Sequence, residues 1–77
     1  MNLGKGLTNR IAVCRAEKKW TQSELAAALG VTRQTVISIE KNKYTPSLAM
    51  GFKIAKVFGK DINDIFTYMD PEEGEEK

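Results

Sequence analysis

The sequence predicts an all-α domain made of five short helices, on three observations. Residues that begin and end helices recur at short intervals from residue 8 to residue 66, apolar residues return at helical spacing, and no segment alternates convincingly like a strand. The chain of 77 residues is near the lower size limit for a core without metal or disulfide. We therefore expect one compact domain over residues 1–69, followed by an acidic disordered tail over residues 70–77.

Composition argues against several classes of protein. The chain has one cysteine, Cys14, and no histidine, so an internal disulfide is excluded and a zinc site, which needs about four ligands, is not expected. Because no histidine can activate it, Cys14 is expected to be a small buried apolar residue. The sequence has no glycine-rich phosphate loop and no pair of inward-facing carboxylates. We expect no enzymatic activity, no cofactor, no metal and no small-molecule ligand.

Hydropathy gives no sign of a membrane protein. No apolar run approaches the roughly 20 residues that span a bilayer, and the amino-terminal residues lack the apolar centre of a signal peptide. We therefore expect a cytoplasmic protein with no membrane partner.

Charge is unevenly distributed along the chain. Residues 1–69 hold eleven of the twelve Lys and Arg but only five of the ten acids, whereas residues 70–77 hold five acids and one Lys. A basic body suits an anionic partner. Charge alone leaves open a solubilising tail on an average surface.

The first two helices are indicated by different signals. An apolar stripe at helical spacing predicts a helix from Thr8 to Lys18. The stripe is Leu7, Ile11 and Cys14. Thr21 and Glu24 form a capping box that begins the second helix, and Gly30 ends it.

A third helix follows after only three residues. Thr32 is placed to cap it, and a glycine-containing turn of this length predicts a tight helix-turn-helix. Val36, Ile39 and Glu40 lie on its inward side. The outward side carries Arg33, Gln34, Ile37, Ser38 and Lys41.

Two further helices complete the predicted bundle. Pro46 or Ser47 opens the fourth and Gly59 ends it, while Asp61 caps a short fifth helix. The expected inward stripe of the fourth helix is Leu48, Gly51, Ile54, Ala55 and Phe58. After Phe66 the helical pattern fades.

The segment from residue 20 to residue 47 resembles the helix-turn-helix of the Cro and repressor family, also called Xre-like. Gln-Ser-Glu-Leu-Ala begins at residue 22, Gly-Val-Thr-Arg-Gln-Thr-Val at residue 30 and Ile-Glu-Lys-Asn-Lys at residue 39, all at the family's spacing. Within that family the chain looks closest to short bacterial regulators related to the cytolysin repressor. The resemblance covers about residues 9–66. It implies a compact lambda-repressor-like domain that binds double-stranded DNA and represses transcription at a palindromic operator.

The resemblance also implies roles for individual residues, with the third helix in the major groove. The implied base-reading residues are Arg33, Gln34, Thr35, Ile37 and Ser38. The implied contacts to the DNA backbone are Gln22, Thr32, Lys41, Asn42, Lys43 and Tyr44. Arg can bond both guanine acceptors and Gln can pair with adenine, while flanking phosphate contacts set the register. Without the motif, the same residues are ordinary for a solvated helix face.

A symmetric homodimer is expected because one reading helix contacts only a few base pairs. The last helix carries more apolar residues than it can bury alone, and these are the candidate dimer contacts. They are Ile62, Ile65, Phe66 and Tyr68. Residues Met1 to Leu3 are expected to pair as a strand beside Phe66 to Met69, giving the domain a short terminal β-pairing.

Arg15 and Glu40 are expected to form a largely buried ion pair between the first and third helices. Arg15 lies beside the apolar stripe of the first helix, and Glu40 lies on the inward side of the third. Burying either charge without a partner would cost free energy, so the position of both residues near the inward sides of their helices suggests that they form a pair. The family resemblance points to the same pair.

Two differences from the family's usual sequence and one alternative function bear on this interpretation. Gly51 stands at a mid-helix position where the family usually carries alanine, either to allow close helix approach or because it is tolerated. The amino terminus is longer than in the shortest relatives. The alternative function is a protein-interaction module, such as the antitoxin partner of a toxin, with the acidic tail folding on its partner. The basic and polar face with Arg33, Gln34 and Lys43 favours DNA instead.

Overall fold

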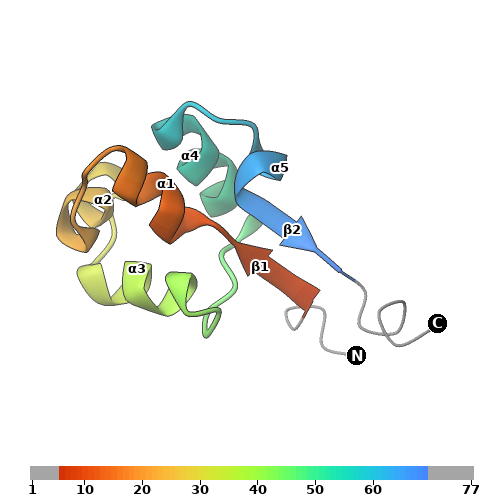
Figure 1. The fold of residues 1–77 in the computed structure, drawn as a ribbon. Coiled ribbons are helices and arrows are strands. Elements are labelled where there is room, and N and C mark those ends of the chain that lie inside the picture. The colour runs from red at the N-terminus through yellow and green to blue at the C-terminus, as the bar shows by residue number, and fades with distance from the viewer. Residues whose placement is uncertain (1–5, 70–77) are drawn as a thin grey trace.

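The computed structural model describes residues 6–69, which form five helices and a two-stranded sheet (Figure 1). In chain order the elements are β1 (Leu7–Asn9), α1 (Ile11–Glu17), α2 (Gln22–Leu29), α3 (Arg33–Glu40), α4 (Leu48–Phe58), α5 (Ile62–Ile65) and β2 (Phe66–Tyr68). The helices pack together, α3 runs along one edge of the helical body, and the two strands extend away from it (Figure 1). The predicted all-α class with a small terminal sheet is confirmed.

Local signals begin and end the helices as predicted. At the start of α2, the Glu24 N–H donates to Thr21 Oγ1 over 3.0 Å, and the Thr21 N–H donates to Glu24 Oε1 over 2.7 Å, which completes the capping box. The side chains that cap α3, α4 and α5 are those of Thr32, Ser47 and Asp61. Gly30 and Gly59 end α2 and α4 in the left-handed conformation, at φ 77° and 66°, where a side chain would be strained.

The prediction for the first helix is wrong at its amino-terminal end. The helix begins at Ile11, and the preceding Leu7–Asn9 is strand β1, antiparallel to β2. Leu7 pairs with Tyr68 and Asn9 with Phe66. The Asn9 side chain explains where the helix starts, because its Oδ1 accepts the Ile11 N–H over 3.0 Å.

The terminal β-pairing is present with a different partner from the one expected. Residues Phe66–Tyr68 do form a strand, but they pair with Leu7–Asn9. Met1 to Leu3, the expected partner, lies outside the described residues. A strand of three residues is too short to show an alternation in the sequence, so the sequence pattern did not indicate its partner.

The core lies where the five helices meet. Its eleven buried residues are Ile11, Cys14, Leu25, Ala26, Leu29, Val36, Ile39, Ile54, Ala55, Phe58 and Ile65. Trp20 packs against this core with its ring centroid 5.8 Å from that of Phe58. Cys14 is 3% exposed, and burial raises the pKa of its thiol, which agrees with its predicted role as a small core residue.

The predicted stripe of α4 is correct except at its first residue. Gly51, Ile54, Ala55 and Phe58 are buried, but Leu48 is 74% exposed. Leu48 directly follows the cap residue Ser47 and is the first residue of the helix. No helix within residues 6–69 has the length and apolar character needed to cross a membrane.

Candidate nucleic-acid interface

Helices α2 and α3 form a helix-turn-helix whose turn is fixed by backbone geometry. The Gly30 and Val31 N–H groups both donate to the carbonyl oxygen of Ala26, over 2.8 and 3.0 Å. α2 packs on α3, and Val36 and Ile39 of α3 are 1% and 2% exposed in the core. Because this side of α3 is buried, the opposite side must face solvent.

The outward side of α3 carries the predicted base-reading residues. Arg33 and Gln34 are exposed, while Thr35, Ile37 and Ser38 are half-buried. Gln34 Nε2 lies 3.5 Å from Ser38 Oγ, and the hydroxyls of Thr32 and Thr35 are 3.0 Å apart. These bonds hold amide and hydroxyl groups at one surface, where they can donate to or accept from base edges.

A concavity of about 230 Å³ lies on this surface. Its lining residues are Thr32, Gln34, Thr35, Ser38 and Tyr44. The concavity brings together residues predicted to read bases and residues predicted to contact the DNA backbone. Tyr44, which follows α3, is 51% exposed at its edge.

The turn after α3 presents the remaining predicted backbone contacts. Lys41, Asn42, Lys43 and Tyr44 are all exposed. Asn42 adopts the left-handed conformation with φ 61°, and the Lys43 N–H donates to the Ser38 carbonyl oxygen over 2.9 Å. This closed turn places two lysines beside the end of α3, where positive charge suits both the helix dipole and a phosphate.

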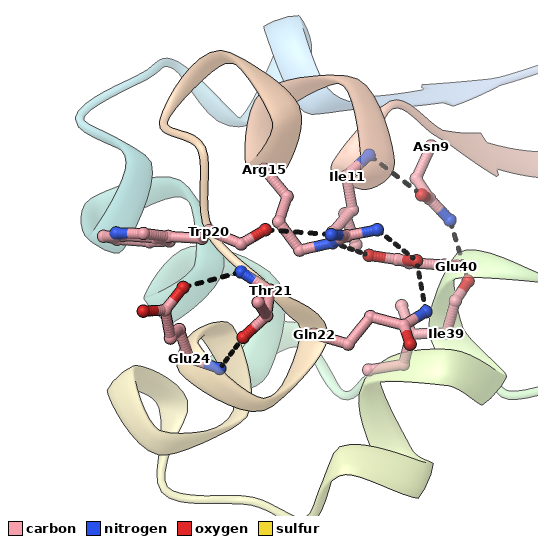
Figure 2. A network of polar contacts seen from close by, with 9 residues as sticks. All are labelled: Asn9, Ile11, Arg15, Trp20, Thr21, Gln22, Glu24, Ile39 and Glu40. Atoms are coloured by element: carbon pink, nitrogen blue, oxygen red, sulfur yellow. Dashed lines mark hydrogen bonds and ion pairs between the residues drawn. The ribbon is translucent and has the colours of Figure 1, made fainter.

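The predicted ion pair between Arg15 and Glu40 is present (Figure 2). Arg15 Nε donates to Glu40 Oε2 over 2.8 Å, and Arg15 Nη2 to Oε1 over 3.4 Å. Arg15 Nη1 also donates to the Trp20 carbonyl oxygen over 2.9 Å. The two side chains are 20% and 8% exposed, so the pair ties α1 and the start of α2 to the end of α3 with little solvent screening.

Gln22 belongs to the same network, which the sequence did not indicate. Its Nε2 donates to Glu40 Oε1 over 3.1 Å, and its side chain is half-buried (Figure 2). Gln22 was predicted to contact the DNA backbone. In this structure one of its two amide hydrogens is bonded to Glu40, which leaves the other for a second acceptor.

Asn9 is a further polar residue that sequence reasoning missed. Its Nδ2 donates to the Ile39 carbonyl oxygen over 2.9 Å and to Asn42 Oδ1 over 3.1 Å. An asparagine just before a helix is a common capping signal, and this could have indicated its bond to Ile11. Its bonds to the end of α3 join residues 30 and 33 positions apart, and no local pattern predicts them.

An apolar surface lies on a different part of the molecule. A concavity of about 150 Å³ is lined by Leu7, Pro46, Ser47, Leu48, Gly51, Ile62 and Phe66. Of the predicted dimer contacts, Ile62 and Phe66 are half-buried here and Tyr68 is 49% exposed. Ile65 is 1% exposed in the core of the single chain, so its assignment to a dimer contact is corrected to a core role.

Comparison with known proteins identifies the family. A helix-turn-helix family matches residues 11–65. The chain is 54% identical over 66 residues to an uncharacterised helix-turn-helix-type transcriptional regulator of Methanocaldococcus jannaschii, covering 86% of this chain and all of that protein. It superimposes on a crystal structure of a Bacteroides fragilis protein assigned to DNA binding with TM-score 0.72, at 34% identity over 79% of this chain and 98% of that one.

A more distant likeness is to an antitoxin, HipB of Escherichia coli, at 40% identity over 48 residues. The match covers 62% of this chain and about half (51%) of HipB. The family match spans most of the chain, and the regulator from Methanocaldococcus jannaschii aligns over its whole length. The chain therefore belongs to the Xre-like helix-turn-helix family and is a DNA-binding transcriptional regulator.

Proposed function

We propose that this regulator is a repressor that binds a palindromic operator as a symmetric homodimer. The observation that carries the proposal is the outward side of α3, where Arg33 and Gln34 are exposed beside a concavity lined by hydroxyl and amide groups. Such a surface offers both donors and acceptors to the major groove, whose base pairs differ in their pattern of donors and acceptors.

Each part of this surface has a distinct role in the proposal. Arg33 and Gln34, in the first turn of α3, contact base edges, with Thr35, Ile37 and Ser38 beside them. Lys43 and its neighbours in the turn contact phosphates, which fix the register of the helix but carry no sequence information. Their positive charges make binding fall steeply as salt rises, because each neutralised phosphate releases counterions.

The homodimer is supported by the apolar surface. Leu48, 74% exposed, lies at the concavity with half-buried Ile62 and Phe66, and Tyr68 exposes about half of its surface. A second copy that covers this surface would remove apolar area from water and double the number of base pairs read. We assign this surface to the contact between the two copies.

DNA selection from a random-sequence library tests the proposed operator. We expect one enriched inverted repeat, and a reporter placed behind that repeat should be transcribed less when the chain is expressed. Arg33→Ala should relax the preference at one base pair in each half-site by about 1–3 kcal/mol, whereas Lys43→Ala should weaken all sequences about equally. Lys56→Ala, a change at another exposed lysine in α4, is the matched control for charge. Recovery of no preferred sequence would contradict the proposal.

Sedimentation at micromolar concentration tests the homodimer. The wild-type chain should sediment as a dimer, and Leu48→Lys should shift it toward monomer without unfolding it, since this side chain is largely exposed. A wild-type chain that is monomeric in solution and binds the operator as a single copy would refute the proposed assembly.

The second candidate function is that of an antitoxin, which the likeness to HipB favours. It predicts that the chain neutralises growth inhibition caused by the product of a neighbouring gene. Co-expression with each neighbouring gene would measure this. Neutralisation without recovery of any preferred DNA sequence would favour the antitoxin over the repressor.

A further inference from the structure

The side chain of Asn9 has only one orientation that satisfies its two backbone partners (Figure 2). Its Oδ1 accepts the Ile11 N–H over 3.0 Å, and its Nδ2 donates to the Ile39 carbonyl oxygen over 2.9 Å. A backbone N–H can only donate and a backbone carbonyl can only accept, so turning the amide around would lose both bonds.

This orientation determines the orientation of a second amide. Asn9 Nδ2 carries another hydrogen, and it lies 3.1 Å from Asn42 Oδ1. Only an acceptor satisfies that hydrogen, so Asn42 must turn its oxygen toward Asn9 and its own Nδ2 away. Within residues 6–69, no acceptor bonds to Asn42 Nδ2, and the Asn42 side chain is exposed.

The backbone at Asn42 is held as firmly as its side chain. The residue is left-handed at φ 61°, its N–H donates to the Ile39 carbonyl oxygen over 3.0 Å, and the next N–H, that of Lys43, donates to the Ser38 carbonyl oxygen. The amide nitrogen of Asn42 therefore points outward from a turn with a defined geometry, beside the exposed side chain of Lys43.

We infer that Asn9 is a positioning residue for DNA binding, which presents the Nδ2 hydrogens of Asn42 to a DNA phosphate. Phosphate oxygens only accept hydrogen bonds, so the group offered to them must be a donor. The inference rests on the proposed function. It also gives β1 a role, because Asn9 joins the sheet to the turn that follows the reading helix.

Asn42→Asp is the sharpest test of the orientation. Aspartate keeps an oxygen for Asn9 to bond but replaces the outward N–H groups with an anionic oxygen, which a phosphate repels. We expect a melting temperature lowered by only a few degrees, because a negative charge is unfavourable at the carboxyl end of a helix, and a loss of more than about tenfold in affinity for every operator sequence, measured by titration of the full chain. An Asn42→Asp variant that binds DNA like the wild type overturns the inference.

A double-mutant cycle tests whether Asn9 acts through Asn42. Asn42→Gly removes the amide and is compatible with φ 61°, and it should lower affinity about tenfold without changing base preference. Asn9→Ala should lower affinity by a similar factor, and the double variant should be no weaker than Asn42→Gly alone. If the two losses multiply, Asn9 acts independently of Asn42 and the inference is wrong.

Controls separate this inference from the proposed function. Asn63→Ala removes another exposed asparagine, on α5, and should leave affinity unchanged. If Asn9→Ala does not fold, Asn9→Asp replaces it, since aspartate still accepts from Ile11 but can donate neither to Asn42 nor to the Ile39 carbonyl oxygen. Should Arg33→Ala alter base preference while Asn42→Asp binds normally, only this inference fails. Should Arg33→Ala also be without effect, the proposed function fails with it.

Discussion

Replacing Glu40 with Gln should destabilise the domain by about 2–3 kcal/mol, although the two side chains have nearly the same shape. The Glu40 carboxylate accepts from Arg15 Nε and Nη2 and from Gln22 Nε2, and its side chain is only 8% exposed. Glutamine offers one oxygen in place of two and turns an NH₂ group toward these donors. At least one donor then loses its partner, and Arg15 loses its counter-charge.

The magnitude follows from how completely the pair is buried. Breaking a fully buried pair costs about 3–5 kcal/mol, but Arg15 remains 20% exposed and keeps its bond to the Trp20 carbonyl oxygen, so the expected value lies below that range. In a domain of this size, about 1 kcal/mol shifts the melting temperature by about 4–8 °C. The expected decrease is therefore about 8–24 °C.

Circular dichroism during thermal and urea unfolding measures this change for Glu40→Gln and Arg15→Met, singly and together. Coupling requires that the double variant lose less stability than the sum of the single variants. Glu17→Gln is the matched control, because Glu17 pairs with Lys60 at 3.5 Å while the two side chains are 56% and 38% exposed, and its loss should cost less than about 1 kcal/mol. If the Arg15 and Glu40 variants are harmless, or if their effects add, the ion pair does not act as argued.

Three further expectations concern the core and the helix ends. Cys14 should react with a thiol reagent only after unfolding, because its side chain is buried. Burial raises the pKa of this thiol in the folded state, so the folded protein keeps its full stability below the unfolded pKa, near 9.0, and loses part of it as pH rises above that value. Thermal melts at several pH values, compared with those of Cys14→Ala, measure this decrease. Gly51→Ala should raise the free energy of unfolding by about 0.5–1 kcal/mol, because alanine favours a helix and its added carbon would lie at an ordinary contact distance of 3.5 Å from Ile62 Cδ1. A loss of stability would mean that α4 and α5 approach too closely at this position for a side chain. Thr21→Ala should cost about 1 kcal/mol in urea unfolding because it removes the acceptor for the Glu24 N–H, and no loss would contradict the capping box.

Most of the fold could be predicted because its signals are local. The cap at Thr21 and the left-handed glycine at Gly30 each depend on residues within one helical turn. The sheet was predicted with the wrong partner because Leu7 and Tyr68 are far apart in sequence and each strand has only three residues. Leu48 was assigned to the core because periodicity predicts which face of a helix a side chain lies on, but not which turns of that helix other elements pack against.

The candidate site could be predicted only in part, for the same reason. Two charged residues on inward sides of predicted helices indicated the pair of Arg15 and Glu40, since an isolated buried charge is costly. Gln22 and Asn9 are uncharged, and such residues are common at exposed positions without any partner. Their bonds to α3 depend on how the elements are placed in space, which the sequence pattern does not encode locally.

The distribution of polar contacts indicates how α3 is held in place. Val36 and Ile39 keep α3 against the core, but apolar contact has no direction and permits small rotations of a helix about its axis. Directional hydrogen bonds restrict such rotations, and those from Arg15 and Gln22 both end on Glu40, in the last turn of α3. That turn leads directly into the exposed loop with Lys43, so the same bonds that fix the rotation of the reading helix also fix its distance from the proposed phosphate contacts. Stability and DNA affinity should therefore decrease together when this network is broken, whereas substitutions on the outward side of α3 should change affinity alone.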